Sequence, residues 1–115
     1  MRFPFFFFLF AVIAGAAERS GQPDIDYLLG YIARTDCRFI RGGKEYGGKE
    51  AADHLRSKLS HAGARVQTAE QFIDGLASKS YLTGEPYSIK TNNGQISPAG
   101  EWLRQALVQH RKSIK

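Results

Sequence analysis

The sequence predicts an α+β fold, in which four helices and two short β-hairpins form one domain with a small antiparallel sheet. Four stretches carry apolar residues at the i, i+3, i+4, i+7 spacing that buries one face of a helix. Two other stretches contain short strand-like segments on either side of a glycine-containing turn. Because an isolated hairpin is only marginally stable in water, we expect the two hairpins to pair and to rest against helices on one face.

The first helix is expected to begin at Pro23, a residue tolerated in the first helical turn. Asp24 and Asp26 place negative charge in that turn, where the helix dipole favours it. The helix should end near residues 35–36. Its predicted buried stripe is Ile25, Leu28, Leu29 and Ile32.

Two further helices are predicted in the middle of the chain. One follows the Gly47-Gly48 pair and ends at Gly63, a plausible C-cap. The next is preceded by Thr68 and Gln71, which are spaced as a capping box. The buried stripe of the earlier helix is predicted to be Ala51, Ala52, Leu55, Leu59 and Ala62, and that of the later one Phe72, Ile73, Leu76 and Ala77.

The predicted hairpins occupy residues 37–46, with Gly42-Gly43 at the turn, and residues 87–97, with Asn93-Gly94 at the turn. Ser97 is then expected to cap a last helix that has Pro98 at its first position. The inward face of this helix is predicted to be Trp102, Leu103, Ala106 and Leu107.

Residues 1–17 have the three parts of a secretory signal peptide. Arg2 supplies the basic start, an apolar run follows, and residues 14–17 are small. Cleavage is expected after Ala16, with Ala17 as the alternative. A membrane anchor is disfavoured, because a spanning helix needs about 20 apolar residues. We therefore expect residues 18–115 to be one domain released into the periplasm, which meets the membrane only through the signal peptide before cleavage.

The chain contains 16 basic and 11 acidic residues, a formal net charge of +5. Loss of Arg2 with the signal peptide leaves 15 against 11, or +4. A spread of basic residues suits a soluble surface, and it also permits a protein or an anionic polymer of the cell envelope as partner. Nucleic acid is not expected as a partner, because export separates the protein from it.

Cys37 is the only cysteine, so the chain cannot form an internal disulfide. A free cysteine behaves as a small apolar group, and we expect this one to be buried. Pairing between two chains, which would give a homodimer, is the alternative.

Catalytic and metal-binding motifs fail on inspection, and no catalytic residue, metal or cofactor is predicted. Residues 43–49 match the spacing of a phosphate-binding loop, but Glu50 follows where Ser or Thr would hold magnesium. His54 and His61 lie seven residues apart, about 10.5 Å along a helix, which is too far for one ion. Glu50 and His54, four residues apart, are expected to form a surface ion pair.

Aromatic and basic side chains gather instead in the two predicted hairpins, and tyrosine and arginine are favoured at binding interfaces. We expect a binding surface formed by Arg38, Arg41, Lys44, Tyr46, Tyr87 and Lys90. The leading prediction is a non-enzymatic binding or interaction domain of the cell envelope. A small cell-wall hydrolase that uses His54, Glu50 or Cys37 is one alternative, and a self-associating structural protein is another.

Five stretches together resemble those of a known protein family: residues 25–29, 37–46, 50–55, 68–73 and 80–87. They resemble the YfeK-like family of small, uncharacterised proteins exported by Gram-negative bacteria. The resemblance extends over nearly all of residues 18–115. It implies a bacterial, periplasmic protein, and it implies no activity and no functional residues.

Overall fold

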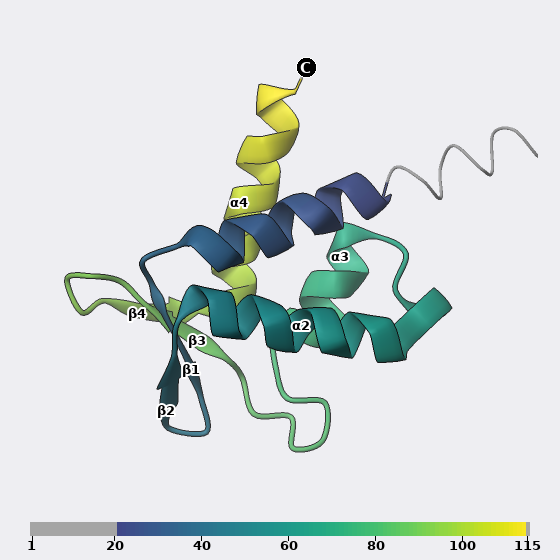
Figure 1. Ribbon diagram of the computed structural model, residues 1–115. Helices are drawn as coiled ribbons and strands as arrows, with labels where there is room; N and C mark the ends of the chain where they lie inside the picture. Colours follow the sequence, from purple (N-terminus) through teal and green to yellow (C-terminus); the bar gives the residue numbers. More distant parts are fainter. Residues whose placement is uncertain (1–20, 115) are drawn as a thin grey trace, which may run out of the picture.

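The computed structural model describes residues 21–114, and the predicted signal peptide lies outside them (Figure 1). The fold is α+β, as predicted. Residues 21–34 are helical and are referred to as the N-terminal helix. The other elements are β1 (Arg38–Arg41), β2 (Lys44–Tyr46), α2 (Gly48–Ala62), a 3-10 turn (Gly63–Arg65), α3 (Ala69–Phe72), a π-helical segment (Ile73–Ala77), β3 (Ser88–Lys90), β4 (Ile96–Pro98) and α4 (Ala99–Ser113).

The two hairpins join into one antiparallel sheet of strand order β2-β1-β3-β4, which confirms the predicted pairing. The first hairpin turns at Gly42-Gly43, where φ angles of 58° and 79° lie in the left-handed region that favours glycine. Its two-residue turn matches the right-handed twist of the flanking strands. The hairpins meet where β1 pairs with β3, and this pairing places Phe39 opposite Ile89.

Helices cover only one face of this sheet (Figure 1). Successive side chains along a strand point to opposite faces. Phe39 and Ile89, which are paired, are both buried and define the inner face. The ring of Phe39 meets that of Trp102 on α4 edge to face, with centroids 5.5 Å apart. The outer face carries the alternate residues Arg38, Ile40, Glu45, Ser88, Lys90 and Ile96.

The apolar core lies between the helices and the inner face of the sheet. All four residues of the stripe predicted for the N-terminal helix are buried. The stripe of α2 is buried less completely, because Ala51 and Leu59 are half-buried at its edges, and Trp102 on α4 is half-buried as well. The largest fully buried side chains are Phe72, Ile25, Leu28, Ile32, Ile73, Ile89 and Leu103.

Gly48 brings the N-terminal helix and α2 into close contact. It is the buried first residue of α2, and a Cβ built on it would lie 2.2 Å from the backbone oxygen of Ile32. The sequence pattern indicated only a chain break at this point. The structure gives the glycine a second role, because any side chain there would push the two helices apart.

Two predicted helix starts are wrong. The N-terminal helix already includes residues 21 and 22, so Pro23 is not its first residue. Ser97 does not cap α4, because it lies in β4 opposite Ile89, and Pro98 is the N-cap. Strand pairing extends to the helix itself, since the amide of Ala99 donates to the carbonyl of Tyr87 at 3.0 Å.

The predicted capping box at Thr68 and Gln71 is present, with both of its hydrogen bonds formed. The helix that follows does not stay regular. α3 gives way after one turn to the π-helical segment, and the Ser78 hydroxyl donates to the carbonyl of Ile73 at 2.5 Å. Apolar spacing alone gave no sign of this change.

Candidate binding site

The six residues predicted to form one binding surface lie on two faces of the sheet. Arg38 and Lys90 are paired neighbours on the outer face. Arg41, Lys44 and Tyr46 share the inner side with Phe39, since Arg41 is opposite Lys44 and Tyr46 is opposite Phe39. Tyr87, two residues before Ile89, is buried on the same side. The predicted single surface is therefore divided.

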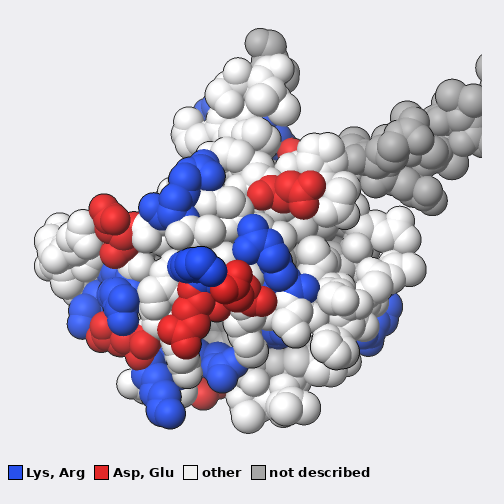
Figure 2. Space-filling model, in the orientation of Figure 1, with Lys and Arg blue, Asp and Glu red and all other residues white. Residues whose placement is uncertain are grey.

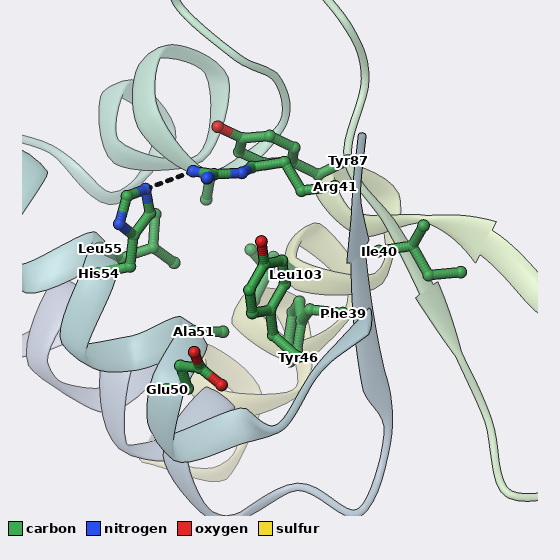
Figure 3. A pocket seen from close by; sticks show the side chains of 11 residues that line it. Phe39, Ile40, Arg41, Tyr46, Glu50, Ala51, His54, Leu55, Tyr87 and Leu103 are labelled. Atoms are coloured by element: carbon green, nitrogen blue, oxygen red, sulfur yellow. Dashed lines mark hydrogen bonds between the residues drawn. The ribbon is translucent and has the colours of Figure 1, made fainter. Parts of the chain in front are cut away.

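A partly enclosed cavity of about 250 Å³ lies between the first hairpin and α2 (Figure 3). Three of the predicted residues, Arg41, Tyr46 and Tyr87, line it, and Lys44 does not. Most of the remaining lining is apolar, and only Glu50 and His54 add polar groups. The complete lining is Phe39, Ile40, Arg41, Tyr46, Glu50, Ala51, His54, Leu55, Ala77, Tyr87 and Leu103.

Arg41 and His54 join β1 to α2 at the rim of this cavity. The Nη1 of Arg41 lies 2.7 Å from the Nε2 of His54 (Figure 3). A guanidinium has no acceptor atom, so Arg41 donates and the imidazole accepts. The proton of the neutral ring is then on Nδ1. Burial, followed by the positive charges of Arg41 and Lys58, lowers the pKa of His54, which favours the neutral ring.

Glu50 lies toward the backbone end of the Tyr46 side chain, whereas Arg41 and His54 lie toward its hydroxyl end (Figure 3). It belongs to the first turn of α2, where negative charge is favoured. Within residues 21–114 its carboxylate forms no ion pair. The predicted ion pair with His54 is therefore wrong, because packing of β1 beside α2 gives His54 the guanidinium of Arg41 as partner instead.

Lys58 supports the cavity wall by holding Tyr87, a role that no sequence motif predicts. Its ammonium donates to the Tyr87 hydroxyl at 3.1 Å and to the Leu76 carbonyl at 2.8 Å. It also lies 5.0 Å from the centroid of the Tyr87 ring. A signal was present in the sequence, since a lysine three residues after Leu55 and four before Ala62 falls on the inward stripe of α2.

The outer-face residues form a separate, exposed ion network. The ammonium of Lys90 donates to Glu45 at 2.8 Å, and Arg38 lies 3.7 Å from the same carboxylate. The hydrogen bond from Lys90 is the main reason that the pKa of Glu45 is lowered. Glu45 thereby offsets the repulsion between two cations that are direct neighbours across strands.

Elsewhere on the surface shown in Figure 2, basic and acidic side chains are interspersed. On α2, for example, Asp53 lies between Lys49 at 3.1 Å and Arg56 at 3.5 Å. Exposed pairs of this kind contribute little stability. They do keep this face from presenting a broad area of one charge.

Cys37 is half-buried rather than fully buried, and it packs against the edge of the core. It lines a shallow depression with residues 35–36, 91–93 and 95, which is not the cavity that His54 and Glu50 share. Cys37 is therefore separated from Glu50 and His54, the other two groups considered for hydrolysis. Disulfide pairing of Cys37 between chains stays a prediction, which electrophoresis with and without a reductant would test.

The described part of the chain has neither a cluster of metal-binding side chains nor a helix of membrane-spanning character. In residues 21–114, no three His, Cys, Asp or Glu side chains lie close enough together to hold a metal ion. Over the same residues, none of the helices combines the length and the apolar composition of a membrane span.

Fold and cavity together define a small α+β domain with a pocket between a hairpin and a helix. The chain matches DUF5329, a family of unknown function, over residues 19–111, and it belongs to that family. It is also 45% identical over 64 residues to the uncharacterized protein YfeK of Salmonella typhimurium. This confirms the predicted resemblance. The alignment covers 55% of this chain and 53% of YfeK, so it spans about half of that relative. No solved structure matches the chain.

Proposed function

We propose that this protein is a non-enzymatic binding domain of the bacterial cell envelope, and that its ligand site is the cavity between the first hairpin and α2. The cavity itself is the observation that supports this function. Protein interiors are close-packed, so an apolar space with a few polar groups at its rim is the usual form of a ligand site. Here Phe39, Leu55 and Leu103 supply apolar surface, and Arg41 and Glu50 supply charge.

The size of the cavity restricts what it can hold. Sites for drug-sized ligands span roughly 300–1,000 Å³, and a cavity of about 150 Å³ holds benzene. A volume of about 250 Å³ suits one group the size of an amino-acid side chain. This favours a small molecule, or one side chain of a partner protein, over a polymer of the envelope.

The expected location depends on the sequence. Residues 1–17 have the pattern of a signal peptide, and the resemblance to YfeK-like proteins implies a periplasmic home. Both support a ligand or partner that is present in the bacterial envelope.

The test is binding of small apolar compounds to the purified protein, with acids, amides and amines in one panel. Some members should raise the midpoint of thermal unfolding, because a ligand that binds only the folded state stabilises it. Ala51→Leu narrows the cavity and should abolish that rise, whereas Ala51→Val should reduce it. Ala64→Leu, the same change at an exposed position outside the cavity, is the control. If no compound shifts the wild-type midpoint, the binding function is wrong.

One observation favours a second candidate, a small cell-wall hydrolase: Glu50 and His54 line the same cavity. Against it, the free nitrogen lone pair of His54 already accepts a hydrogen bond from Arg41. Release of soluble fragments from purified cell wall by the wild-type protein, and its loss in Glu50→Gln, would support the hydrolase. The binding-domain proposal predicts that no fragments are released.

A further inference from the structure

We infer that the cavity takes an apolar group of residue size that carries one free carboxylate, such as an apolar amino acid or the C-terminal residue of a peptide. This inference rests on the binding function proposed above. It names the class of ligand and the residue that recognises its charge, Arg41.

The charge of Arg41 has no acidic partner in the described part of the chain. Its guanidinium forms a hydrogen bond with the neutral imidazole of His54 and lies over the Tyr46 ring, 5.7 Å from the centroid. Neither of these cancels the positive charge. Arg38, on the same strand but on the outer face, differs in having the carboxylate of Glu45 at 3.7 Å.

His54 holds Arg41 without neutralising it. The imidazole accepts one N–H bond of the guanidinium and leaves further donors of the fork for a ligand. A guanidinium matches the two oxygens of a carboxylate in geometry and in charge. Arg41 is therefore a carboxylate-binding group that is held in place at the rim of an apolar cavity.

Glu50 limits the charge of the ligand. It lines the same cavity as Arg41 but lies toward the opposite end of the Tyr46 side chain (Figure 3), and within residues 21–114 it has no basic partner. A ligand with negative charge at both ends would place one of them near this carboxylate. A single carboxylate at the Arg41 end, with the apolar body among Phe39, Leu55 and Leu103, avoids that repulsion.

The experiment compares N-acetyl-leucine with N-acetyl-leucinamide by isothermal titration calorimetry of the purified protein. The two compounds share the apolar body and differ in the carboxylate. The acid should bind about tenfold more tightly or better, the usual effect of one charge-assisted hydrogen bond. Free leucine and a short peptide that ends in leucine distinguish the two sources of this chemistry. Tighter binding of leucine identifies a free amino acid as the ligand, and tighter binding of the peptide identifies a peptide C-terminus.

Variants identify the residue that is responsible for the preference for the acid over the amide. Arg41→Gln should remove the preference for the acid, and Arg41→Lys should weaken it, because lysine keeps the charge but not the fork. Arg38→Gln changes the matching residue on the outer face and should leave the preference intact. Glu50→Gln should tighten binding of the acid by removing a like charge. Circular dichroism melts of each variant confirm that it is folded.

Two outcomes separate this inference from the function on which it rests. If the amide binds as well as the acid and Ala51→Leu abolishes both, the carboxylate assignment is overturned while the binding site stands. The same holds if amines bind best and Glu50→Gln abolishes their binding. If no compound binds the wild-type protein, the site and the inference both fall.

Discussion

Arg38 and Arg41 are three residues apart on one strand, and yet they meet different surroundings. An odd separation places them on opposite faces of the sheet. Arg38 joins an exposed ion network, whereas Arg41 contacts a neutral histidine beside a cavity. The chemistry of each arginine therefore depends on the face that it occupies. The amino-acid composition alone does not distinguish the two arginines.

The pKa of His54 tests the electrostatics of the rim. Burial and two nearby cations lower it, so the folded protein prefers the neutral ring. The stability that this provides is present above the ordinary value of 6.5 and is lost as the pH falls through the lowered pKa. NMR titration of the His54 ring should give a midpoint below 6.5.

Arg41→Gln removes one of the two cations and should move the His54 midpoint upward. The midpoint should return only partly toward 6.5, because burial is a larger cause of the lowered pKa than the charge of Arg41. A midpoint at or above 6.5 in the wild-type protein would contradict the neutral, acceptor role given to this ring.

The candidate site could be predicted in part. Interleaved aromatic and basic residues pointed to Arg41, Tyr46 and Tyr87, and these do line the cavity. The partner of His54 could not be predicted, because Arg41 reaches it only through the packing of β1 against α2. The position of Lys90 depends on the register between β1 and β3, which no local pattern encodes.

At the level of elements, local sequence signals predicted the turns and helix caps that depend on neighbouring residues. The Gly42-Gly43 turn and the Thr68 capping box are both determined by residues within a few positions, and both are present. The start of α4 was misplaced by one residue, because pairing of β4 with β3 continues to Pro98. The π-helical segment was missed because its irregular turn is not reflected in the apolar spacing.

Lys58 links α2 to the π-helical segment and to Tyr87, just before β3, and this gives a test of stability. Lys58→Met keeps most of the apolar stem but removes the donor to Tyr87 and Leu76. The unfolding free energy should fall by about 1–3 kcal/mol, the cost of leaving buried acceptors without a partner. Urea denaturation measures this change.

Lys49→Met is the matched control on the same helix. Lys49 pairs with Asp53 on the surface and is 83% exposed. An exposed pair of this type contributes about 0–1 kcal/mol, so the change should be small. If both variants lost the same stability, the role given to Lys58 would be wrong.

At the scale of the whole molecule, the pairing of the two hairpins and the α+β class followed from simple expectations about marginal hairpins and amphipathic helices. The cavity did not follow from them. It forms where half-buried Ala51 and Tyr46 leave space between a helix and a hairpin, and such a gap depends on how well two surfaces fit.

Export is tested by the mass of the protein. We expect the full chain, produced in a Gram-negative bacterium, to be recovered from the periplasmic fraction without its first 16 or 17 residues. Mass spectrometry distinguishes the two cleavage sites. Recovery of the uncut chain from the membrane fraction would instead indicate an anchor.

The most direct test of the binding site is a residue-by-residue NMR map. Amide shifts of the purified protein are followed during titration with N-acetyl-leucine. The largest changes should fall at cavity-lining positions on β1, β2 and α2, around Phe39, Arg41, Tyr46 and His54, if the cavity is the binding site. Largest changes on the outer face, around Glu45 and Lys90, or no saturable change at all, would contradict it.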